Sequence, residues 1–125
     1  MEIEDEGRRL ELLLPWPPSV NHYWRASGNR RYISPQGMTF RRHVFDAMPV
    51  NWEEMKGRLQ IKVQAYPPDY RKRDLDNILK ALLDSLEHAG AYLNDNQLDK
   101  LVVIRRDVIL GEGKVLITVE TLCAL

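Results

Sequence analysis

The chain has 125 residues, which fits a single domain of ordinary size. With 44% hydrophobic and 29% charged residues the composition is that of a globular protein, and no apolar run is long enough to span a membrane. The single cysteine, Cys123, excludes an intramolecular disulfide and a cysteine-rich zinc site, and no signal-peptide pattern opens the chain, so we expect a cytoplasmic protein.

The first half of the chain begins with an acidic segment and a strand. Residues 1–9 are expected to be flexible, and residues 10–125 are expected to form one domain. Residues 9–16, RLELLLPW, predict a strand that the following prolines end. Residues 19–33 are basic and aromatic and predict a loop.

A helix is predicted to follow this loop. Ser34 and Pro35 have the chemistry of an N-cap and a first helical residue, and the helix is expected to end near Ala47. The residues expected to face the core are Met38, Phe45 and Met48. Arg41 and Arg42 are expected to face solvent.

The second half predicts three strands and one helix. Residues 58–66 alternate between apolar and polar side chains, which is typical of a half-buried strand. Residues 75–89 carry a leucine stripe at helical spacing, and Gly90 is well placed to end that helix. Residues 100–110 and 114–120 predict two strands joined as a hairpin by a glycine-containing turn.

This order of elements, strand–helix–strand–helix–strand–strand, predicts an α+β fold. A single mixed sheet of about four strands with two helices packed on it buries all the apolar faces.

The charged residues are unevenly distributed along the chain. The formal net charge is zero, which alone argues against a nucleic-acid partner, but there is no acidic residue between Leu12 and Phe45. Because the local field decides contact with a polyanion, two basic groups are candidate DNA-binding residues. They are Arg25, Arg30, Arg31, Arg41 and Arg42 in the first group and Arg71, Lys72 and Arg73 in the second. The alternative is that these side chains are scattered over a solvated surface.

The stretch YRKRDLDNILK, residues 70–80, places two acids directly after a basic run. Asp74 and Asp76 lie where a helix is expected to begin, and Lys80 follows Asp76 by one turn. Carboxylates in this arrangement suit a Mg²⁺ site, with Asp95 as the first choice for a third ligand. The weaker choices are Asp84 and Asp99. The alternative is structural: a helix cap and a small ion pair one turn apart.

Three stretches of the sequence resemble the RusA family of Holliday junction resolvases. They are LPWPPSVNHYW near the start, RDLDNILKALLDSLEHAGAYLNDNQ in the middle, and the closing pair of strands, and together they cover the chain from about Leu12 to Glu120. The resemblance implies a RusA-like fold and a small homodimeric endonuclease, phage- or prophage-encoded, that cuts four-way DNA junctions symmetrically. It also implies Mg²⁺, with Mn²⁺ as a substitute, and no small-molecule cofactor or membrane partner.

The catalytic residues of the family fall on matching positions of this sequence. The resemblance implies that Asp74, Asp76 and Asp95 bind the metal and are catalytic, and that Lys80 is the catalytic lysine. On this interpretation the three aspartates of one protomer hold one or two Mg²⁺ ions, while the basic side chains of residues 71–73 hold the DNA backbone.

Other functions compete with this interpretation. A transferase that uses Asp-x-Asp to hold a nucleotide diphosphate lacks a glycine-rich phosphate loop here. A non-catalytic DNA-binding module would use the acids only as helix caps. A nuclease for other branched DNA would share every feature of the sequence.

Overall fold

The elements of the fold follow the expected order, with an extra hairpin near the start. The computed structural model describes residues 7–122, so residues 1–6 and Cys123 lie outside the described residues. In chain order the elements are β1 (Arg9–Pro15), α1 (Val20–Tyr23), β2 (Trp24–Ser27), β3 (Arg30–Ile33), α2 (Pro35–Ala47), β4 (Leu59–Tyr66), the 3-10 helix η1 (Leu75–Ile78), α3 (Leu79–His88), the 3-10 helix η2 (Asp95–Gln97), β5 (Leu98–Arg105) and β6 (Lys114–Thr121). None of the helices in residues 7–122 is long and apolar enough to cross a membrane.

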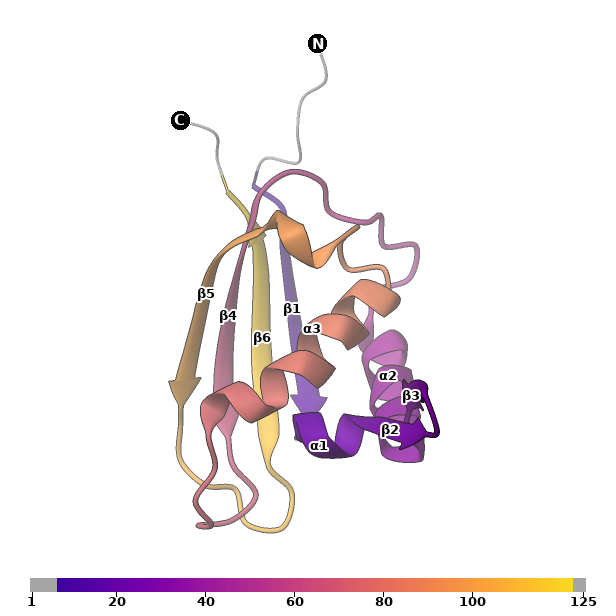
Figure 1. The fold of residues 1–125 in the computed structure, drawn as a ribbon. Helices are drawn as coiled ribbons and strands as arrows, with labels where there is room; N and C mark the ends of the chain where they lie inside the picture. Colours follow the sequence, from indigo (N-terminus) through magenta and orange to yellow (C-terminus); the bar gives the residue numbers. More distant parts are fainter. Residues whose placement is uncertain (1–6, 123–125) are drawn as a thin grey trace.

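The main sheet has four strands in the order β1-β6-β4-β5, and α2 and α3 cover one of its faces (Figure 1). β6 pairs antiparallel with β1 and β4, whereas β4 and β5 are parallel and α3 connects them. The predicted α+β class, with one mixed four-stranded sheet and two packed helices, is confirmed. The expected flexible segment, residues 1–9, overlaps the sheet by one residue, because Arg9 is the first residue of β1.

The core lies between the sheet and the two helices. The four apolar residues of β4 point toward the helices and are each at most 1% exposed: Leu59, Ile61, Val63 and Ala65. From α3, Leu82 and Leu86 pack against them and are fully buried. Gly90 ends this helix with a φ of +82°, a conformation that glycine adopts without strain. The predicted strand, leucine stripe and helix end are therefore confirmed.

The predicted hairpin of residues 100–110 and 114–120 is wrong. β4 lies between β5 and β6 in the sheet, and the chain after Arg105 crosses below the end of β4, where the backbone N–H of Ile109 donates to the carbonyl of Pro67 at 2.8 Å. Gly113 is required by packing: an added Cβ would lie 2.9 Å from Pro68. The glycines indicate a tight bend, but bend chemistry does not specify which strand lies alongside.

The ends of α2 agree with the sequence, but its buried face does not. The Ser34 hydroxyl accepts the N–H of Gly37 at 3.0 Å, as predicted for the N-cap. Met38 and Phe45, which were expected in the core, are 53% and 61% exposed. The buried residues are instead Phe40 and Val44, and Arg41 turns inward. Both stripes have helical spacing, so the sequence alone does not decide which one faces the sheet.

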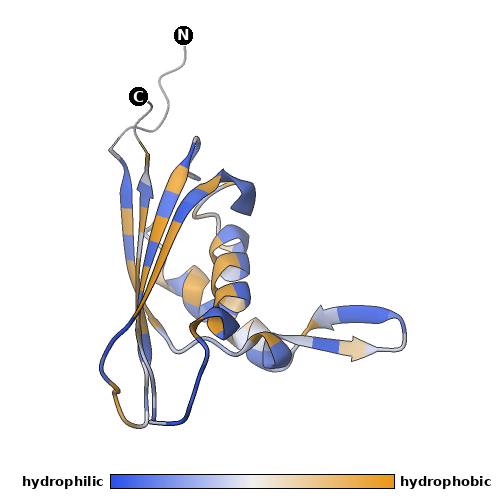
Figure 2. Ribbon diagram, turned by 60° about the vertical axis from the view of Figure 1, so that its left-hand side comes forward, coloured by the Kyte–Doolittle hydropathy of each residue, from blue (hydrophilic) through white to orange (hydrophobic). Residues whose placement is uncertain are grey.

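Residues 24–33 form a two-stranded arm instead of a loop. β2 and β3 pair antiparallel around a tight turn at Gly28 and Asn29, and the arm projects from the body of the protein (Figure 2). Gly28 has a φ of +62°, which matches the first central position of a type II′ turn. The polar side chains of this stretch hid the strand pattern.

Candidate active site

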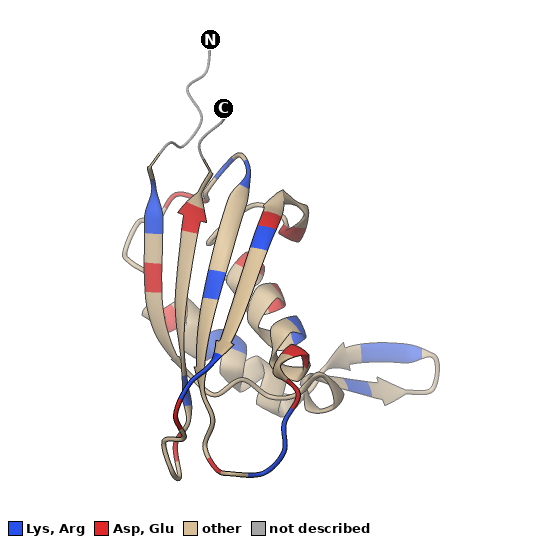
Figure 3. Cartoon of the chain, turned by 90° about the vertical axis from the view of Figure 1, so that its left-hand side faces the viewer, with Lys and Arg blue, Asp and Glu red and all other residues tan. Residues whose placement is uncertain are grey.

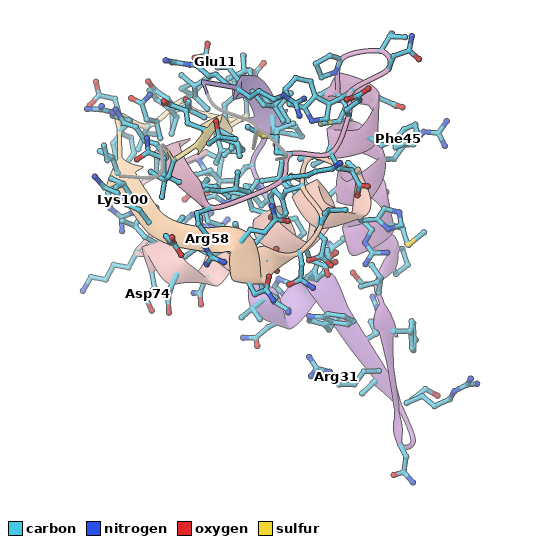
Figure 4. The ribbon with its side chains drawn as sticks, turned by 90° about the horizontal axis from the view of Figure 1, so that it is seen from above. Glu11, Arg31, Phe45, Arg58, Asp74 and Lys100 are labelled. Atoms are coloured by element: carbon cyan, nitrogen blue, oxygen red, sulfur yellow. The ribbon has the colours of Figure 1, made fainter. Side chains whose placement is uncertain are left out.

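Asp74 and Asp76 lie where the loop after β4 leads into the 3-10 helix η1. Asp74 occupies the N-cap position of η1, yet its side chain makes no capping hydrogen bond. Both residues are exposed, and within residues 7–122 no hydrogen bond or ion pair reaches either carboxylate. In Figure 4 the Asp74 side chain points outward from the ribbon. Helix capping therefore does not explain this pair.

Two of the three basic side chains before these aspartates bind the carboxylate of Asp69. Asp69 accepts hydrogen bonds from Arg71 at 3.0 and 3.1 Å and from Arg73 at 2.9 Å. The hydrogen bonds from Arg71 lower the pKa of Asp69 to about 2. Lys72 is exposed beside this cluster. Because residues 69–73 carry three basic side chains and one acidic side chain, the loop directly before Asp74 has a net positive charge.

Lys80 lies on the first turn of α3 and does not pair with Asp76. Within the described residues no salt bridge joins the two side chains, so the ion pair that the structural alternative requires is absent. The Lys80 ammonium instead lies 5.9 Å from the ring centre of Trp24, at the base of the β2–β3 arm. No pattern in the sequence indicates that Trp24 and Lys80 are neighbours.

Arg41 is the clearest departure from the expected DNA-binding set. Its Nη2 donates to Asp84 at 2.7 Å and its Nε donates to the Tyr23 hydroxyl at 2.9 Å, while that hydroxyl donates to Asp84. The side chains of Arg41 and Asp84 are 19% and 23% exposed. Arg41 therefore joins α2 to α3 and does not face solvent. By contrast, Arg42 is exposed and pairs with Asp46 within α2.

Asp95 begins η2 and lies in a partly buried, acidic environment. Its N–H donates to Glu87 Oε1 at 2.8 Å, and its Oδ1 is buried without a hydrogen-bond partner in the described part of the chain. Burial raises the pKa of Asp95, and the charges of Glu87 and Asp84 raise it further, whereas the nearby Tyr92 hydroxyl and the charge of Lys80 offset only part of this rise. A cation would relieve both the repulsion and the unpaired oxygen, so this carboxylate fits a metal ligand.

Gln97 holds Asp95 in place, and sequence analysis missed it. The Gln97 side chain accepts the N–H groups of Leu93 and Asn94 at 2.8 Å and donates to the carbonyls of Met55 and Gly57. The sequence signal was the Asn94-to-Gln97 capping box.

One chain does not bring the three aspartates together. Asp95 precedes the first residue of β5, whereas Arg105, the last residue of β5, donates to the carbonyl of Arg73 at 2.6 Å, next to Asp74. An eight-residue strand such as β5 is roughly 23 Å long. Within residues 7–122 no three His, Cys, Asp or Glu side chains form a group that could hold a metal ion. The candidate ligands thus lie at opposite ends of the parallel strand pair, Asp95 at one end and Asp74 with Asp76 at the other.

Comparisons with known proteins identify the family. The sequence profile described as Endodeoxyribonuclease RusA matches residues 15–120. The chain belongs to the RusA family. The crossover junction endodeoxyribonuclease RusA of Enterobacteria phage HK97 is 50% identical over 97 residues, which are 76% of this chain and 81% of that protein. The RusA proteins of Enterobacteria phage 82 and Escherichia coli strain K12 are each 34% identical and cover 86% of this chain, with 91% of each relative matched. The family resemblance seen in the sequence is confirmed, and this protein is therefore a nuclease.

Proposed function

We propose that this protein is a metal-dependent endonuclease that cuts four-way DNA junctions with Mg²⁺ as its ion. The observation that carries the proposal is the pair of exposed carboxylates of Asp74 and Asp76, which have no hydrogen-bond or ion-pair partner within residues 7–122 and directly follow a positively charged loop. The chain is also 50% identical over 97 residues to the phage HK97 RusA. Hard carboxylate oxygens suit Mg²⁺, and Mn²⁺ is the expected substitute.

Each candidate site residue has a role in hydrolysing a phosphodiester bond. A bound divalent ion would polarise the scissile phosphate and make a bound water a better nucleophile. Asp74, Asp76 and Asp95 supply the oxygens that hold the ion. Lys80, exposed on α3, places a positive charge beside the phosphate as negative charge develops on it. Lys72, with Arg71 and Arg73, holds the flanking backbone.

The separation of Asp95 from Asp74 and Asp76 favours a homodimer with shared sites. We propose that Asp74 and Asp76 of one protomer meet Asp95 of the other, because residues 7–122 of one chain do not gather the three. This replaces the expectation that one protomer supplies all three ligands. A two-fold dimer also provides the two matching sites that symmetric cutting of a four-way junction requires.

A mixing experiment tests the shared site. Asp76→Asn and Asp95→Asn are each expected to be inactive as homodimers. If the sites are shared, a mixed dimer has one site with both substitutions and one intact site, so remixing should restore nicking of one strand. If each chain holds its own site, every site in the mixed dimer carries one substitution and no cutting returns. Sedimentation of the wild type should give the mass of two chains if the protein is a dimer.

The proposed activity is tested by a gel assay with Mg²⁺. A four-way junction, a fork, a flap and a linear duplex are compared for the wild type, for Asp76→Asn, and for the matched control Asp107→Asn, an exposed aspartate in the connection before β6. We expect paired cuts in the junction by the wild type and the control, and binding without cutting by Asp76→Asn. A wild type that binds the junction but cuts no DNA would refute the proposal, and preferential cutting of the fork or flap would assign a different branched substrate. A cytoplasmic location stays a prediction.

A further inference from the structure

The β2–β3 arm has one face turned toward the body and one turned away from it. Directly opposed residues of an antiparallel pair share a face, and successive residues alternate. The pairs Trp24–Ile33 and Ala26–Arg31 therefore form the inner face, where Trp24 and Ile33 are half-buried. The outer face is formed by the pairs Arg25–Tyr32 and Ser27–Arg30, all exposed. Figure 3 shows the arm standing clear of the sheet and helices, with basic residues on both strands.

The outer face of the arm carries positive charge without compensation. Within residues 7–122 neither Arg25 nor Arg30 takes part in an ion pair, and residues 12–45 contain no acidic residue. Tyr32 lies opposite Arg25 and is 47% exposed. Two free guanidinium groups beside an exposed aromatic ring are suited to contact phosphates and exposed bases.

The base, or root, of the arm is held to the body of the protein by several contacts. The arm begins directly after Tyr23, whose hydroxyl bonds with Arg41 and Asp84 and whose carbonyl accepts the N–H of Ser34 at 2.9 Å. At Gly37 an added Cβ would lie 2.8 Å from the Tyr23 carbonyl oxygen, so the helix and the root are in close contact. These contacts fix the direction in which the arm leaves the body.

The root also lies beside the proposed catalytic lysine. The Trp24 ring has the Arg31 guanidinium 4.9 Å and the Lys80 ammonium 5.9 Å from its centre. DNA whose phosphate reaches Lys80 therefore passes the base of the arm. Each four-residue strand extends roughly 13 Å, which corresponds to about four nucleotides at 3.4 Å per nucleotide of one strand.

We propose that the β2–β3 arm is the branch-selective contact of the enzyme, and this inference rests on the proposed junction-cutting function. A linear duplex is a cylinder that curves away from an arm projecting beyond the cleavage point. At a four-way junction the backbones of two duplex arms converge there, so that Arg25 and Arg30 meet phosphates that a linear duplex does not offer. The arm is narrow enough for this position, because residues 26–29 at its tip are small: Ala, Ser, Gly and Asn.

The test removes the two charges and measures binding to both DNA shapes. The variant is Arg25→Gln with Arg30→Gln, and the matched control is Lys62→Gln with Lys100→Gln, which removes two exposed charges from strands β4 and β5 of the main sheet. Kd is measured with Ca²⁺ as the ion at several salt concentrations, for a four-way junction and a linear duplex. Cutting of the junction with Mg²⁺ and sedimentation mass are measured alongside.

The expected result is specific to the arm and to the junction. Each lost phosphate contact lowers the slope of log affinity against log salt by about 0.9. The arm variant loses two contacts in each protomer of the proposed dimer, so its slope on the junction should fall by about 3.6 and its slope on the duplex only a little. The control should lose slope on neither DNA. Equal losses on both DNAs, or no loss on either, would overturn the proposal. A fall in sedimentation mass would also overturn it, since the arm would then bind a second copy of the chain. A wild type that selectively binds the junction but never cuts it would refute the proposed function and leave the arm result interpretable.

Discussion

The contact between Arg41 and Asp84 should contribute measurably to the stability of the fold. We consider Arg41→Gln and Asp84→Asn, singly and together. Asp84 Oδ2 accepts from both the Arg41 guanidinium and the Tyr23 hydroxyl, and both members of the ion pair are less than one quarter exposed. The pair also joins the two helices that cover the sheet, one of which carries Lys80.

The magnitude follows from the number and charge of the hydrogen bonds. A hydrogen bond to a charged group contributes about 1.5–3 kcal/mol to stability. Asp84→Asn keeps one acceptor oxygen for Tyr23 but removes the charge, so we expect the free energy of unfolding to fall by about 2 kcal/mol. Arg41→Gln should cost a similar amount, and the double variant should show a coupling energy of about 1–2 kcal/mol, since the two residues are in direct contact.

The assay is a double-mutant cycle by urea denaturation at pH 7. The matched control is the second Arg–Asp pair of α2, Arg42 with Asp46, whose side chains are 79% and 61% exposed. An exposed pair of this kind is expected to couple by less than about 0.5 kcal/mol. If the Arg41–Asp84 pair couples no more strongly than this control, the two residues do not form the link between helices that the structure shows.

The same contact predicts a pH dependence. Burial alone would raise the pKa of Asp84, but hydrogen bonds from Tyr23 and Arg41 outweigh it and lower the pKa. The ionised form is therefore favoured in the folded state, so its stabilisation is present above the unfolded pKa of about 3.9 and is lost as the pH falls through the lower folded value. Asp84→Asn should lack this part of the acid-induced loss of stability, and an unchanged difference between wild type and variant down to pH 2 would contradict the assignment.

Three further predictions concern the arm root, η2 and the basic loop. Gly37→Ala should lower the free energy of unfolding by about 1–2 kcal/mol, because the new methyl group would lie 2.6 Å from Ile33, as measured by urea denaturation. Gln97→Ala removes four hydrogen bonds that hold Asp95 in place and should cost about 3 kcal/mol by the same method, with a loss of junction cutting. The carboxyl resonance of Asp69 should titrate by NMR with a midpoint near the pKa of about 2, so that the loop loses its Arg71 contact only below the usual range for aspartate.

The first two of these predictions have control variants in the chain, and the third is compared with the ordinary pKa of an aspartate. Gln36→Ala is the matched exposed position on α2, and Asn96→Ala is the exposed neighbour of Gln97 in η2. Losses equal to those of the controls would contradict the packing and hydrogen bonding described for Gly37 and Gln97. A midpoint for Asp69 near 3.9, the ordinary aspartate value, would show that Arg71 does not hold that carboxylate in solution.

The sequence by itself determined the elements whose signals are local. The alternation of residues 58–66, the Ser34–Pro35 helix start and the end of α3 at Gly90 all follow from the conformational preferences of a few adjacent residues. The family was equally accessible, because the motif around Asp74 and Asp76 is contiguous in the chain.

Only the tertiary structure decided which of these local pieces meet. The position of β4 between β5 and β6, the inward turn of Arg41 and the exposure of Phe45 depend on contacts between residues far apart in the chain. The same holds for Asp95, which the sequence joins to Asp74 by homology and which the fold places at the other end of β5. Periodicity fixes which residues share a face of a helix or strand, but the partner of that face is chosen by packing over the whole chain.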